Sequence, residues 1–300
     1  MFSGTKRPGI IGVVLLVCLL AGVAGCQYLG RPGSQSAVKQ TGRLCVAVSI
    51  VPQAAFVEAV GGDLVEVLTM IPPGASPENY APTPQAMEQL SRSRLYFSIG
   101  VPAEQSGILP RLNQVNAQMK VVDLAARVDQ VYPAREFSPG EKDPHRWLSP
   151  RRAVEMVKCI YEELAALDPD HADVFRQNAG AYQSQLEQLD AQIRASLAGV
   201  GGRTFIVYHP AFGYFADDYG LKMIALEEEG KQATSENLQA VIDAARKENI
   251  KVVFYQAEMD SKQAKTLARE LGGQAELVAP LAPNYIENLR QTAQVLARSM

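Results

Sequence analysis

The sequence predicts an α/β protein of two lobes, each with a parallel sheet flanked by helices, joined by one long, rigid backbone helix. Strand-type and helix-type segments alternate in both halves of the chain, and a long helical segment separates the halves. The 300 residues also exceed the ~100–200 residues of a usual domain. We therefore expect an N-terminal lobe at 44–167, a linking helix at 168–200 and a C-terminal lobe at 201–300.

Each half repeats the same order of elements. Runs rich in β-branched and aromatic residues predict strands at 44–49, 65–71, 95–99, 120–122, 204–208, 222–226, 252–255 and 275–278. Apolar periodicity and start signals predict helices at 53–60, 84–91, from about 150, and at 235–248, 261–271 and 284–298. Strands that alternate with helices in this way form parallel sheets covered on both faces.

The linking helix has a clear start and a helical apolar pattern. Asp168 is predicted to cap its N-terminus, with Pro169 in the first turn. The apolar residues that follow step mostly by three or four: Val174, Tyr182, Leu186, Leu189, Ile193 and Leu197. About 29 residues at ~1.5 Å each make a rod of ~45 Å, long enough to span both lobes and to resist a wide hinge opening.

The N-terminus predicts export. Lys6 and Arg7 precede an uncharged run that is shorter than the ~20 apolar residues of a spanning helix, so residues 1–25 are expected to be a signal peptide. Val23-Ala24-Gly25-Cys26 resembles the bacterial lipobox, in which Cys26 is lipidated after cleavage, and residues 26–43 would form a flexible tether. We expect a protein anchored by lipid to the cell membrane, on its periplasmic or extracellular face. The alternative is a plain signal peptide with an incidental Cys26.

The charge balance argues against a nucleic-acid partner. Loss of residues 1–25 removes two basic residues and no acidic one, so the formal net charge changes from −3 to −5. The chain also holds no basic run. Cys45 and Cys159 lie in a predicted strand and a predicted helix, where we expect small apolar fillers. A disulfide between them is the alternative for an exported protein.

Three side chains of metal-ligand type stand out. Glu78 lies in the loop after a predicted strand, His209 directly follows another, and His145 lies just before a predicted helix. Ligands of open α/β sheets bind beyond the carboxyl ends of the strands, so we expect the three to converge in one cleft. A carboxylate and two imidazoles bind zinc and related divalent metals. The alternatives are structural loop histidines and a solvated carboxylate at Glu78.

Neighbouring residues are expected to have other roles. Trp147 and Tyr80 are predicted to wall the cleft or to pack beneath it. His171 lies on an acidic first helical turn and is predicted to be a surface residue. The run Glu227-Glu228-Glu229 is typical of a solvated loop and is not assigned to the site.

Three motifs resemble those of a known family. They are Pro-Gly-Ala-x-Pro-x-x-Tyr-x-Pro-Thr-Pro at 73–84, Asp-Pro-His-x-Trp-Leu-Ser-Pro at 143–150 and His-x-Ala-Phe-Gly-Tyr-Phe at 209–215. From Leu44 to the C-terminus the chain resembles the solute-binding lipoproteins of bacterial ABC transporters for zinc and manganese. The resemblance implies two α/β lobes on a rigid helix, a metal held between them, and delivery to a membrane permease.

Two positions depart from the family pattern. The family usually has His where Glu78 stands, and Asp or Glu where Ala279 stands. A Glu78 carboxylate binds zinc or manganese directly, whereas Ala279 has no donor atom. The fourth ligand is then water, a second Glu78 oxygen, a neighbour such as Glu258 or Asp260, or part of the cargo. The acidic, His-rich loop of many zinc-specific members is also missing from 136–143.

The predicted function is capture of a divalent metal outside the membrane, by a monomer, and delivery to an ABC permease. Zinc ranks first and manganese next, and affinity is expected to fall as pH drops through the histidine range near ~6.5. The alternative is a divergent paralogue that binds a metal chelate, or that acts as a surface adhesin or partner protein. An enzyme of the zinc-hydrolase type is not expected, because the sequence has no His-Glu-x-x-His segment.

Overall fold

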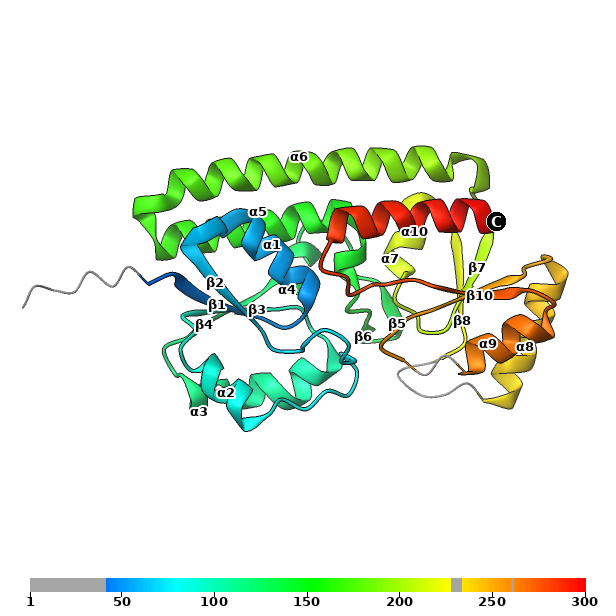
Figure 1. Cartoon of the computed structure of the whole chain (residues 1–300), viewed down its shortest axis with the longest axis horizontal. Helices are drawn as coiled ribbons and strands as arrows, with labels where there is room; N and C mark the ends of the chain where they lie inside the picture. The colour runs from blue at the N-terminus through cyan, green and yellow to red at the C-terminus, as the bar shows by residue number, and fades with distance from the viewer. Residues whose placement is uncertain (1–41, 228–233, 260–261) are drawn as a thin grey trace, which may run out of the picture. The chain divides into compact units, whose positions relative to one another are not determined.

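The computed structural model describes residues 42–227, 234–259 and 262–300. The predicted signal peptide and nearly all of the predicted tether lie outside the described residues. So do Cys26, Glu228, Glu229 and Asp260. The part from Arg43 to Met300 is one compact unit that contains two separate four-stranded sheets (Figure 1). Over the described ranges, no helix combines the length and the apolar character that a membrane crossing requires.

The N-terminal sheet is parallel throughout, with the strand order β2-β1-β3-β4. Helices cover both faces of this sheet, so apolar residues fill its central strands. In β1, Val46, Ala47 and Val48 are 0% exposed. Its strands are β1 (Leu44–Val48), β2 (Val65–Thr69), β3 (Leu95–Ser98) and β4 (Lys120–Asp123). Its helices are α1 (Val51–Gly61), α2 (Pro84–Leu90), α3 (Leu112–Val115), α4 (Leu124–Asp129) and α5 (Pro150–Leu167). A small antiparallel hairpin of β5 (Glu136–Ser138) and β6 (Glu141–Lys142) precedes α5.

The C-terminal sheet repeats this arrangement, with the strand order β10-β9-β7-β8 and parallel pairing. Its strands are β7 (Thr204–Val207), β8 (Lys222–Ala225), β9 (Val252–Tyr255) and β10 (Gln274–Leu277). The helices of this half are α7 (Gly213–Tyr219), α8 (Ser235–Lys247), α9 (Lys262–Glu270) and α10 (Tyr285–Ser299). In both sheets the strand that comes first in the chain lies in the interior. The connections from β1 to β2 and from β3 to β4 therefore run to opposite sides, as do those from β7 to β8 and from β9 to β10. Such a reversal opens a crevice at the carboxyl ends of the strands.

Two long helices tie the sheets together. α6 (Ala172–Leu197) packs against α1, α5 and α10, and Figure 1 shows it running alongside the latter two. α10 begins with Tyr285, whose ring meets Phe56 of α1 at 4.8 Å between centroids. Further along, Leu296 of α10 belongs to the same apolar cluster as Phe205 of β7. One hydrophobic core therefore runs through both lobes on the α6 side, as expected for a rigid connection. The predicted fold class is confirmed.

The start of the long helix differs from the prediction. Residues Pro169–His171 form a 3₁₀ turn, and the regular helix begins at Ala172. Asp168 does not cap it, because its carboxylate instead lies 2.7 Å from Nδ1 of His171. Val174 is 44% exposed, and the buried stripe begins at Phe175, one residue later. The predicted side-chain cap and the burial of Val174 were therefore wrong, although Asp168 does stand at the N-cap position of the 3₁₀ turn with Pro169 in the first turn. The remaining stripe lies on or at the edge of the buried face.

The two cysteines are not paired. Cys45 and Cys159 are both free thiols, so the disulfide alternative is wrong. Cys159 is 2% exposed within the hydrophobic core, and burial raises the pKa of its thiol to about 11. The side chain acts as a small apolar filler, as predicted.

The buried stripe of α6 makes a direct test of the shared core. Leu189→Ala is expected to lower the free energy of unfolding of the metal-free protein by about 2–5 kcal/mol, because Leu189 is 0% exposed and its removal leaves a cavity. Val174→Ala, on the exposed face of the same helix, is the control and should change it by less than about 0.5 kcal/mol. Urea denaturation measures both, and equal losses in the two variants would contradict the packing described.

Candidate metal centre

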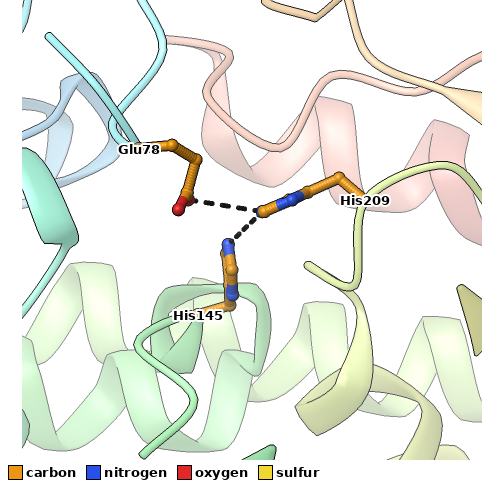
Figure 2. A group of neighbouring side chains, drawn as sticks. All are labelled: Glu78, His145 and His209. Carbon is orange, nitrogen blue, oxygen red and sulfur yellow. Dashed lines mark hydrogen bonds and ion pairs between the residues drawn. The ribbon is translucent and has the colours of Figure 1, made fainter. Parts of the chain in front are cut away.

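The three predicted ligand side chains meet in one cleft (Figure 2). Their ligand atoms all lie within 4.8 Å of one another. Nε2 of His209 is 3.1 Å from Nε2 of His145 and 3.4 Å from Oε1 of Glu78. Two ligands of a tetrahedral zinc ion, each ~2.0–2.1 Å from it, stand ~3.3 Å apart. The arrangement thus has the size needed to hold one such ion.

Glu78 reaches the cleft from the loop between β2 and α2. Its backbone N–H donates to Oγ of Ser76 at 3.3 Å, and the carbonyl of Pro77 accepts from the N–H of Ala103 at 2.8 Å. At the end of the loop, Thr83 caps α2 through its hydroxyl, with proline in the first turn as predicted. The side chain of Glu78 is 16% exposed, so it is not a solvated loop carboxylate.

His145 is oriented by a buried carboxylate two residues earlier. Oδ1 of Asp143 accepts hydrogen bonds from the backbone N–H of His145 at 2.9 Å and from its Nδ1 at 2.8 Å. Asp143 is 0% exposed, and its Oδ2 lies 3.5 Å from Nε of Arg135. Gly213 leaves the space for this pair, because a Cβ there would stand 2.2 Å from that Nε. The glycine of the third motif therefore serves the histidine of the second.

The rest of the 143–150 motif fixes this segment in place. Arg146 binds both carboxylate oxygens of Asp129, at 2.7 and 3.0 Å. Ser149 caps α5, and Pro150 occupies the first turn. Trp147 is 1% exposed, lines the cleft as predicted, and donates from Nε1 to the carbonyl of Pro280 at 2.9 Å. This bond joins the segment to the loop that follows β10.

His209 is held by a carboxylate that the sequence interpretation left out of the site. Beyond β7 and β8 the pairing continues, since the N–H of Glu227 donates to the carbonyl of Tyr208 at 2.9 Å. This places Oε2 of Glu227 at 3.2 Å from Nδ1 of His209. Glu227 is 2% exposed, so its interpretation as a solvated loop residue was wrong.

The remaining predictions concern residues around the cleft. His171 has 46% of its side chain exposed and is a surface residue, as predicted. Tyr80 is half-buried and packs against the hydrophobic core, but it is not among the residues that line the cleft. Ala279 supplies no side-chain donor, and its carbonyl accepts from Nδ2 of Asn288 at 2.7 Å.

The charges of the site determine its protonation. Burial lowers the pKa of His209, but its hydrogen bonds with Glu227 and Glu78, and their negative charges, raise it to about 9. Burial raises the pKa of Glu78, but its hydrogen bond with His209 and the charges of both histidines hold it below its usual value. At neutral pH the metal-free site therefore holds a His209 imidazolium beside an ionised Glu78.

The hydrogen-bond network also fixes which ring nitrogens face the cleft. Nδ1 of His145 donates to Asp143, and Nδ1 of His209 donates to Glu227. Nε2 of His145 is then a lone-pair acceptor, and the proton on Nε2 of His209 points toward it and toward Glu78. A divalent cation at this point would replace that one proton and meet three acceptors at once.

Together, the fold and the site define a two-lobed α/β binding protein with a buried His-His-Glu cluster between the lobes. The model of the family described as "Zinc-uptake complex component A periplasmic" matches residues 46–299 of this chain. The chain belongs to this family.

Individual relatives agree. The High-affinity zinc uptake system protein ZnuA of Bacillus subtilis is 29% identical over 94% of this chain and 89% of its own length. A crystal structure of ZnuA is 36% identical, covers 86% of this chain and 99% of its own, and superposes with a TM-score of 0.81. The laminin binding protein of Streptococcus agalactiae, described as bifunctional with adhesin and metal transporting activity, is 25% identical. It covers 86% of this chain and 99% of its own, with a TM-score of 0.76.

The unusual charge state of His209 can be measured. In the metal-free protein we expect its ring to titrate near pH 9 in NMR spectra. Glu227→Gln should lower that pKa by about one unit or more, because the amide removes the adjacent negative charge. Glu236→Gln, an exposed change in the first turn of α8, is the matched control and should leave it unchanged. An identical titration of His209 in all three proteins would contradict the role of Glu227.

Proposed function

We propose that this protein captures a divalent metal ion outside the cytoplasm, zinc first and manganese next, and delivers it to the permease of an ABC transporter. The observation that carries the proposal is the convergence of Glu78, His145 and His209 in a buried cleft. The zinc-uptake and metal-transport descriptions of the relatives support it.

The donor set supports zinc as the preferred cargo. Two imidazoles and a carboxylate are ligands for zinc, and a site of this type binds zinc more tightly than manganese. Manganese remains the second choice because the Glu78 carboxylate suits it. Bound metal takes the place of the proton on His209, so affinity should fall by about tenfold per pH unit below the pKa of that group. The relevant window lies toward pH 9 rather than near ~6.5, since the pKa of His209 is raised to about 9.

The organisation of the whole chain follows from this function. We propose that residues 1–25 are a signal peptide, that Cys26 carries the lipid anchor, and that residues 26–43 are the tether. The lobes at 44–167 and 201–300, joined by the linking segment 168–200, would act as a monomer beside the permease. The hydrophobic core shared along α6 supports capture without a wide opening of the lobes.

Binding and release account for the site better than the alternatives. An enzyme is not proposed, because the carboxylates beside the histidines, Asp143 and Glu227, are engaged by Nδ1 atoms and are not placed as a general base. A paralogue without free-metal transport is also less well supported, since three donors are retained and meet. Adhesion stays a second candidate on the strength of the laminin-binding relative.

Calorimetric titration of the metal-free protein tests the proposal. Wild type should bind one zinc ion tightly and manganese more weakly. His145→Ala should bind zinc about 100-fold more weakly or not at all, because one of three protein donors is lost. His171→Ala, in the exposed 3₁₀ turn just before α6, is the matched histidine control and should bind as wild type does.

Thermal unfolding of each metal-free variant shows whether His145→Ala still folds. Repeating the zinc titration of wild type from pH 9 down to pH 6 should show a steady loss of affinity, because protons compete with zinc for His209, whose pKa is raised to about 9. If wild type gives neither heat nor a thermal shift with zinc or manganese, the proposal that it captures free metal is wrong. Such a result would favour a protein that binds a metal chelate or acts as an adhesin.

A further inference from the structure

One carboxylate oxygen in the cleft has no hydrogen-bond partner among the described residues. Glu258 lies in the turn that follows β9 and lines the same cleft as Glu78, His145 and His209. Its Oε2 is buried, and over the described residues it has no hydrogen-bond partner. A buried carboxylate oxygen without a partner has lost its hydration and gained no hydrogen bond in return, which is unfavourable. A cation in the cleft is the partner that would remove this cost.

The topology explains why Glu258 stands at this site. β7 and β9 are neighbours in the C-terminal sheet, with Val207 opposite Phe254. The pairing extends past β7, because the N–H of Tyr208 donates to the carbonyl of Phe254 at 2.7 Å. Continued by two residues, the register places Gln256, the first residue after β9, beside His209. Glu258 follows two residues later, at the same carboxyl edge of the sheet.

The other residues on this side of the cleft offer no equivalent donor. Ala279 has a methyl group, and its carbonyl is engaged by Asn288. The carbonyl of Pro280 accepts from Trp147. Gln256 and Met259 line the cleft, but Nε2 of Gln256 donates to Sδ of Met259 at 3.7 Å, and neither side chain carries a negative charge. Among the described lining residues, Glu258 is the one carboxylate besides Glu78.

We propose that Glu258 is the fourth protein ligand of the transported metal, in place of the acidic residue that position 279 does not supply. The inference rests on the proposed function. Glu258 stands outside the group whose donors lie within 4.8 Å of one another, so its carboxylate turns inward when the ion binds. No hydrogen bond of Oε2 to a described residue has to break for this rotation. The completed site has two imidazoles and two carboxylates, and the two negative charges balance the divalent ion.

Zinc affinity measured by competition with a chromophoric chelator tests this ligand. Glu258→Gln and Glu258→Asp should each bind zinc about tenfold or more weakly than wild type. Asp keeps the charge but shortens the reach by one methylene, so it separates direct ligation from attraction at a distance. Glu270→Gln, an exposed change on α9, is the charge-matched control and should stay within about twofold of wild type. Co²⁺ as a spectroscopic probe should give altered visible bands in Glu258→Gln, because its coordination sphere changes.

The outcomes separate this inference from the function on which it rests. Weaker zinc binding in both Glu258 variants, with altered Co²⁺ bands, supports direct ligation. Zinc affinity equal to wild type in Glu258→Gln overturns the inference and leaves a three-donor site. Loss in Glu258→Gln with full affinity in Glu258→Asp also overturns it, because charge alone then suffices. If wild type itself binds no zinc, the proposed function fails and this inference with it.

Discussion

Two buried carboxylate–imidazole pairs control this site. Asp143 holds His145 and Glu227 holds His209, each through Nδ1, so that both Nε2 atoms turn toward the same point. Burial lowers the pKa of His209, but its hydrogen bonds with Glu227 and Glu78 and their negative charges raise it to about 9. Without a cation the ring therefore holds a proton, and its Nε2 lies 3.1 Å from Nε2 of His145. The carboxylates around the two histidines therefore favour a positive charge at this point, and the donor atoms of Glu78, His145 and His209 determine which divalent ion is bound most tightly. Metal capture in this account is the exchange of a proton for a divalent ion.

The fold supplies this geometry from distant parts of the chain. Glu78 comes from the loop after β2 of the N-terminal sheet and His209 from the loop after β7 of the C-terminal sheet, whereas His145 comes from the segment before α5. The lobes are held by α6 and α10, which pack across both and share one hydrophobic core. The Trp147 bond to Pro280 adds a link at the cleft itself. Such a framework favours small local adjustments, such as rotation of one side chain, over wide hinge motion.

Much of this was predictable from the sequence because the signals are local. Alternating strands and helices, and prolines at the first turns of α2 and α5, indicated the fold. Of the three predicted ligand residues, Glu78 stands in the loop between β2 and α2, His209 just after β7 and His145 just before α5. Asp143 was also within reach of prediction, since an acidic residue two positions before a ligand histidine is well placed to bind its ring.

The predictions that were wrong concern residues whose burial is decided by contacts between distant segments of the chain. Glu227 belongs to a run of three glutamates, which by itself is typical of a solvated loop. Its burial becomes visible only once β8 is paired with β7. Val174 and Phe175 are adjacent apolar residues, and which one faces the core depends on where the helix begins. A register argument along β8, applied to the residue beside His209, would have identified Glu227.

The most direct measurement of the central claim is a crystal structure of the zinc-loaded protein, with data collected at the zinc absorption edge. We expect one anomalous peak between the lobes, ~2.0–2.1 Å from Nε2 of both histidines and ~2.0–2.2 Å from an oxygen of Glu78. A peak elsewhere, or zinc bound through Nδ1 of either ring, would contradict it.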